Sequence, residues 1–131
     1  MTAKPVLSAV TIDDGPKGTP QITELHYDVW SLRVTLDFDS WDGVVYVDFE
    51  SPAGFRVLDE SDLGEMWQGE GHSRHWLHSV VINGWLSQES ARPGFAQDTT
   101  ELTEYLITGL NDCVSILAFD EPTVTILGEA S

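Results

Sequence analysis

SLRVTLDFDSWDGVVYVDFE, residues Ser31–Glu50, is the stretch that decides the expected fold. From Leu32 to Asp39 apolar residues alternate with polar or charged ones, and a second alternating run extends from Val44 to Glu50. A period of two is typical of a strand with one face in the core and the other in water. The connector Ser40–Gly43 predicts that the two strands form an antiparallel hairpin.

Further strands are predicted by short apolar or alternating runs on both sides of this hairpin. They span Ile22–Val29, Phe55–Leu58, Trp76–Asn83, Glu104–Thr108, Cys113–Phe119 and Thr123–Leu127. Turn-forming residues at Gly109–Asp112 and Asp120–Pro122 predict that the last three strands form a meander.

Helical signals are short. A cap at Asp59 predicts a helix through Trp67, and a second short helix is expected near Leu86–Ala91. We therefore expect an α+β fold, with a single antiparallel β-sheet of about six to eight strands and one or two short helices. The 131 residues contain no linker or repeat, so residues 1–131 are expected to form a single domain.

Charge limits the classes of partner. The chain has 22 acidic and 6 basic residues and a net charge of −16. Nucleic acids and anionic membranes need a basic surface, so neither is expected as a direct partner, whereas a cationic protein surface is favoured. The alternative is that the charge serves solubility alone. No run of about 18 apolar residues and no signal peptide are found, so the expected location is cytoplasmic.

The outward face of the hairpin is the candidate partner-binding surface. Setting both apolar faces on the core places Thr35, Asp37, Asp39, Tyr46, Asp48 and Glu50 on the opposite side, where Arg33 can pair with Asp48 or Glu50. The alternative is a solvated face, or one covered by a helix. Trp41 and Trp85 adjoin turns and are the aromatic candidates, whereas Trp30 and Trp76 fit strand or core positions. The full candidate set is Asp37, Asp39, Trp41, Asp42, Tyr46, Asp48, Glu50, Asp59, Glu60, Asp62 and Trp85.

Catalytic motifs are weak. His72, His75 and His78 cluster in the sequence, but in a strand His75 would point away from the other two, and no zinc-binding motif accompanies them. Cys113 follows an aspartate, which disfavours a thiolate, so a buried thiol is expected. There is no phosphate-binding loop and no Gly-x-Ser-x-Gly motif. We expect no catalytic residues, no metal and no cofactor.

Three segments resemble small acidic bacterial immunity proteins, which are encoded beside polymorphic toxins of the contact-dependent, Rhs or type VI kinds. They are Phe49–Glu60 (FESPAGFRVLDE), Asn83–Leu86 (NGWL) and Ile107–Val114 (ITGLNDCV). The resemblance implies a cytoplasmic protein without catalytic activity that binds a cognate toxin domain and occludes its active site. Such toxins are often basic nucleases or other enzymes with cationic clefts, which suits an acidic inhibitor.

Two other functions stay open. An acidic mimic of nucleic acid would inhibit a DNA-binding protein, and a small metal enzyme would use His72, His75 or His78. The sequence leaves both a monomer and a homodimer possible.

Overall fold

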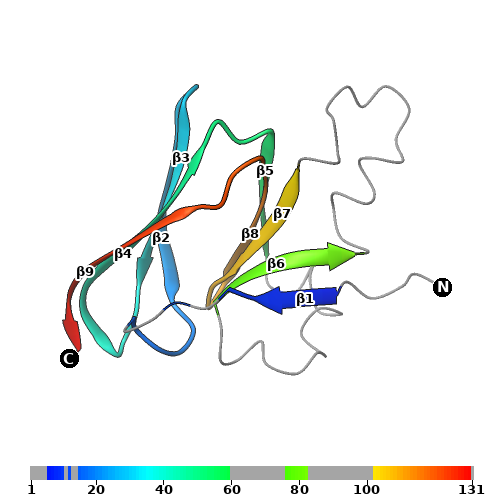
Figure 1. Ribbon diagram of the computed structural model, residues 1–131. Helices are drawn as coiled ribbons and strands as arrows, with labels where there is room; N and C mark the ends of the chain where they lie inside the picture. The colour runs from blue at the N-terminus through cyan, green and yellow to red at the C-terminus, as the bar shows by residue number, and fades with distance from the viewer. Residues whose placement is uncertain (1–5, 11, 13–14, 60–75, 83–101, 131) are drawn as a thin grey trace.

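The computed structural model describes residues 6–10, 12, 15–59, 76–82 and 102–130, which form a sandwich of two antiparallel sheets (Figure 1). The five-stranded sheet has the order β1-β6-β7-β8-β5 and the four-stranded sheet the order β2-β3-β4-β9. The strands of the first are β1 (Val6–Ala9), β5 (Gly54–Asp59), β6 (Leu77–Ile82), β7 (Thr103–Thr108) and β8 (Asp112–Ala118). Those of the second are β2 (Gln21–Tyr27), β3 (Ser31–Asp37), β4 (Trp41–Glu50) and β9 (Thr123–Ala130).

The predicted α+β fold with one sheet is wrong. The described part of the chain is all-β, and the apolar face of the β3–β4 hairpin is covered by a second sheet rather than by helices. A helix or a sheet can fill this role equally well, because each presents an apolar face. Asp59, the expected helix cap, is instead the last residue of β5. The rest of that expected helix and all of Leu86–Ala91 lie outside the described residues.

Strand positions were better predicted than their arrangement. All eight predicted strands overlap observed ones, and β1 is the strand that the sequence did not indicate. The hairpin turn is tighter than expected, because Trp41 already belongs to β4 and its N–H donates to the Phe38 carbonyl at 3.1 Å. Asp39 and Ser40 alone make the turn.

The predicted meander holds for two strands and is wrong for the third. β7 pairs with β8, but β9 crosses to the four-stranded sheet and pairs with the free edge of β4. Val124 and Ile126 of β9 lie opposite Val47 and Val45, and they add to the same apolar face. The turn residues between β8 and β9 would allow β9 to pair with β8 or to cross to β4. Burial of the apolar face decides in favour of β4.

The core lies between the sheets. It joins alternate residues of β3 and β4 to residues of the central strands β7 and β8, which are buried at almost every position. Among the described residues Phe49 is the largest fully buried side chain, and its ring centroid lies 5.6 Å from that of Tyr105 across the interface. Trp76 and Cys113 are buried, as predicted.

Candidate binding surface

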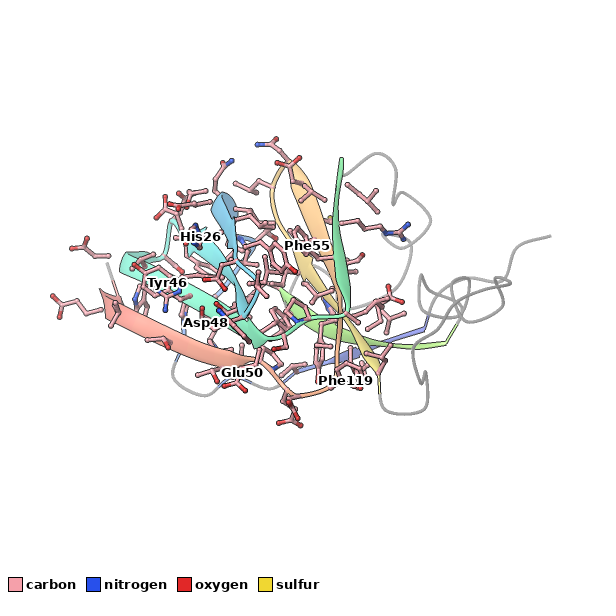
Figure 2. The ribbon with its side chains drawn as sticks, turned by 90° about the horizontal axis from the view of Figure 1, so that it is seen from above. His26, Tyr46, Asp48, Glu50, Phe55 and Phe119 are labelled. Carbon is pink, nitrogen blue, oxygen red and sulfur yellow. The ribbon has the colours of Figure 1, made fainter. Side chains whose placement is uncertain are left out.

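The outward face of the four-stranded sheet carries the predicted acidic residues. Asp37, Tyr46, Asp48 and Glu50 alternate with buried neighbours and therefore share one face. In the register Arg33 faces Asp48, Thr35 faces Tyr46, and β2 adds Glu24 beside Thr35. Figure 2 labels Tyr46, Asp48 and Glu50 along β4, together with His26 of β2. We call Glu24, Asp37, Asp48 and Glu50 the acidic face.

The middle of the acidic face is neutralised by Arg33. Its Nε donates to Asp48 Oδ1 at 2.8 Å and its Nη2 to Asp48 Oδ2 at 3.2 Å, which confirms the predicted cross-strand pair. The guanidinium carbon also lies 4.2 Å from the centre of the Tyr46 ring. The hydrogen bonds to the carboxylate of Asp48 raise the pKa of Arg33, so its guanidinium stays charged. Asp48 and Tyr46 are consequently held in fixed positions.

The other carboxylates of the acidic face form its negative rim. Glu24 and Glu50 are exposed, as is Asp37, and among the described residues none of the three has an ion pair within 4.0 Å. Asp39 is exposed in the β3–β4 turn, and Asp42 is exposed at the start of β4, opposite Glu129. The predicted gathering of carboxylates on one side of the hairpin is therefore present, although Asp48 is already paired.

The remaining candidates lie elsewhere. Trp41 is inward: it packs against the core, and its Nε1 donates to the Leu127 carbonyl at 3.1 Å. Asp59 pairs with Asp112 in the five-stranded sheet, so it does not extend the acidic face. Glu60, Asp62 and Trp85 fall outside the described residues.

An exposed apolar tip supplies the aromatic surface that Trp41 does not. Trp30 and Val29 lie in the β2–β3 turn with 77% and 73% of their surface exposed, so the prediction that Trp30 occupies a strand or core position is wrong. Tyr27 is 50% exposed, and its ring centroid lies 5.1 Å from that of Phe55 on β5. We call Tyr27, Val29 and Trp30 the apolar tip.

Hydrogen bonds fix the apolar tip in place. Asp28 Oδ1 accepts the N–H groups of Trp30 at 2.7 Å and of Ser31 at 2.9 Å, and these bonds lower the pKa of Asp28. The Trp30 carbonyl accepts the N–H of Ser51 at 2.9 Å, and Ser51 has a φ of 41°, a conformation uncommon outside glycine. A turn whose backbone is already held in place loses little conformational entropy when it binds. The sequence signal for this turn is Asp28 three residues before Ser31.

The apolar tip and the acidic face are contiguous. Ser31, which follows Trp30, pairs with Glu50 across β3 and β4, and Ser51 bonds to the Trp30 carbonyl. Glu50 therefore lies between the turn that carries Trp30 and the Arg33–Asp48 pair. An apolar anchor beside a charged rim is the usual anatomy of a protein–protein interface.

We find no candidate catalytic site in the described part of the chain that compares with this binding surface. His78 is buried on β6, whereas His72 and His75 lie outside the described residues. No group of three His, Cys, Asp or Glu side chains within the described ranges could hold a metal ion. No helix in those ranges could cross a lipid bilayer.

Two of the three segments that resemble immunity proteins lie within the described residues, the first of them up to Asp59. Phe49–Asp59 covers the end of β4 and all of β5, and Ile107–Val114 covers the β7–β8 turn, whereas Asn83–Leu86 lies outside the described residues. Neither described segment contains the acidic face as a whole, so the surface and the resemblance are separate arguments. Comparisons with protein-family models, with curated proteins and with solved structures find no match to the chain.

Proposed function

We propose that this chain is an immunity protein, which neutralises a cognate toxin domain by covering its active site or its substrate-binding surface. The observation that carries the proposal is the acidic face, with its three exposed carboxylates around a neutral centre, continuous with the apolar tip. Carboxylates attract and orient a cationic cleft, and a buried aromatic anchor then slows dissociation.

Net charge supports a basic protein as the partner. At −16 the chain repels nucleic acids, anionic membranes and other acidic proteins, including its own copies. The cognate toxin domain of the proposal is therefore basic around its active site. Binding without catalysis needs no metal or cofactor.

The test starts from the reading frame adjoining the gene. Its C-terminal domain is expressed from an inducible promoter in a heterologous bacterium, with and without this chain. Growth arrest that coexpression relieves, together with a complex of the two purified proteins, supports the proposal. Arrest that persists despite stable coexpression contradicts it.

The acidic face should set the association rate. Removing two of its charges in Asp37→Asn/Glu50→Gln is expected to lower kon for the toxin domain about tenfold at low salt and to flatten its salt dependence, with koff almost unchanged. Stopped-flow or surface plasmon resonance at several ionic strengths measures both rates. The matched control is Asp120→Asn/Glu121→Gln, which removes the same charge from the β8–β9 connection. Equal effects of the two pairs would show that only total charge matters.

The apolar tip should set the dissociation rate. Trp30→Ala is expected to raise koff about 30-fold or more, with little change in kon, because it removes a rigid anchor and no charge. Leu110→Ala is the control: Leu110 is 47% exposed in the β7–β8 turn, away from the tip. An unchanged koff in Trp30→Ala would remove the tip from the interface.

A further inference from the structure

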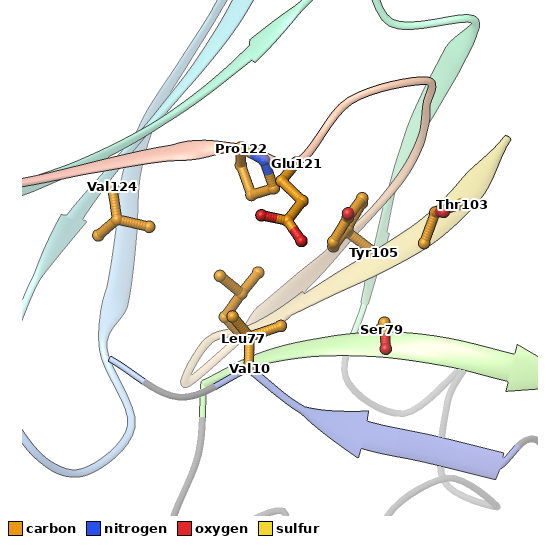
Figure 3. A pocket seen from close by; sticks show the side chains of 8 residues that line it. All are labelled: Val10, Leu77, Ser79, Thr103, Tyr105, Glu121, Pro122 and Val124. Atoms are coloured by element: carbon orange, nitrogen blue, oxygen red, sulfur yellow. The ribbon is translucent and has the colours of Figure 1, made fainter. Parts of the chain in front are cut away.

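A cavity opens between the two sheets on the side where β9 faces β6 and β7 (Figure 3). Its volume is about 340 Å³, within the range of small-molecule sites. Apolar side chains from three separate parts of the chain, Val10, Leu77 and Val124, form its walls with Pro122. It lies apart from the acidic face, because Leu77, Tyr105 and Val124 face the core between the sheets, and the other lining residues lie beside them on strands or in connections.

Polar groups gather at one end of this cavity. Tyr105 and Thr103 bring two hydroxyl groups, and Glu121 brings a carboxylate from the β8–β9 connection, whereas the hydroxyl of Ser79 donates to the Ser8 carbonyl at 3.5 Å. In Figure 3 that carboxylate points toward Tyr105 and Leu77. Tyr105 is only 6% exposed, and burial followed by the negative charge of Glu121 raises its pKa, so its hydroxyl stays protonated at neutral pH. Among the described residues that line the cavity, none is basic.

We infer that this cavity binds a small organic amine, whose ammonium group would bond to the Glu121 carboxylate and to the Tyr105 hydroxyl oxygen while its apolar body packs on Leu77, Val10 and Val124. The inference does not depend on the proposed toxin partner. An anion would meet Glu121 and the nearby Asp120 without a positive counter-charge from the described lining. Glu121 is exposed at the edge of the cavity, so a neutral apolar molecule would leave its carboxylate in water and would gain no charge-assisted bond from it.

The experiment titrates the full chain with three compounds of the same shape, followed by two-dimensional amide and methyl NMR. Benzylamine, which is protonated at neutral pH, is expected to bind saturably with a Kd of about 1 mM or below. This weak affinity is expected because the binding free energy is limited by the small number of non-hydrogen atoms in the ligand. Its shifts should centre on Leu77, Tyr105 and Val124. Benzyl alcohol is expected to bind about tenfold more weakly, because it lacks the charge-assisted bond, and benzoate not at all. Equal affinity for benzylamine and benzyl alcohol would overturn the inference.

Matched variants separate a built site from general attraction to an acidic protein. Glu121→Gln is expected to weaken benzylamine binding about tenfold and Tyr105→Phe about threefold. Glu129→Gln removes the same charge from the far end of β9 and should change the affinity by less than about twofold. Similar losses in Glu121→Gln and Glu129→Gln, or shifts spread over the acidic face, would show nonspecific attraction and overturn the site. A retained native spectrum in each variant excludes unfolding as the cause.

A fourth compound distinguishes a free amine from a lysine side chain of a protein. n-Butylamine reproduces the lysine side chain and fills less of the cavity than a ring does. Tighter binding of benzylamine supports a small-molecule ligand. Tighter binding of n-butylamine would assign the cavity to a lysine of a protein partner and overturn the small-molecule assignment.

Discussion

Phe49→Ala should destabilise the protein by about 3–5 kcal/mol, the range for emptying a well-packed aromatic site. Phe49 is the largest fully buried side chain in the described part of the chain, and its ring packs against Tyr105 of the opposite sheet. The substitution therefore removes contacts that hold the two sheets together. Domains of this size have only about 5–15 kcal/mol of stability in total, so a large share is lost. Urea unfolding followed by tryptophan fluorescence measures the change.

Two controls accompany this measurement. Phe49→Leu keeps most of the buried volume and should cost less than about 2 kcal/mol. Phe119→Ala deletes the same ring from a position that is 41% exposed, so about 1 kcal/mol is expected. If Phe119→Ala proved as costly as Phe49→Ala, the core would not be centred between the sheets.

Gly128→Ala should cost about 3 kcal/mol or more, because β4 and β9 approach each other too closely for a side chain. A Cβ atom on Gly128 would lie 2.1 Å from the Asp42 carbonyl oxygen, and one on Gly43 would lie 1.9 Å from that of Leu127. The two glycines pair across the strands, and Gly128 also has a φ of 105°. The substitution is expected to loosen the end of the sheet that carries Asp42 and Glu129, which amide hydrogen exchange would locate.

Gly18→Ala is the matched control for Gly128→Ala. Gly18 has a similar φ of 93°, but a Cβ atom there would meet nothing within 4 Å. It should therefore cost only the conformational strain, about 1 kcal/mol. The difference between the two variants isolates the close approach of β4 and β9. Equal losses would mean that the backbone conformation alone accounts for the effect.

The sequence by itself determined where the strands other than β1 lie and which side of the hairpin meets water. The period of two is a local property, since successive side chains of a strand point to opposite faces. It correctly placed Asp37, Tyr46 and Glu50 together, and it left Asp48 and Glu50 as alternative partners of Arg33, of which the register selects Asp48. The burial of Cys113 also agrees with the prediction made from the aspartate that precedes it, which disfavours a reactive thiolate.

The exact ends of the strands decided which aromatic residues lie in the core and which lie on the surface. The alternation of apolar and polar residues did not settle this. Because β4 starts at Trp41, that indole shares the inward side of Val45 and Val47. Because β2 ends at Tyr27, Val29 and Trp30 fall in the turn and stand in water. A shift of two residues in a boundary exchanges a core aromatic for a surface one, and sequence patterns do not fix boundaries that finely.

Only the tertiary structure decided the pairing of distant segments. A second sheet replaced the expected helices, and β9 left its neighbour β8 for β4, because each choice covers an apolar face that local signals do not assign to a partner. The cavity, too, depends on tertiary structure. Val10, Ser79 and Glu121 are far apart in the chain and line one cavity only when the sheets pack. Local alternation determines faces, whereas contacts between faces depend on the burial of the whole chain.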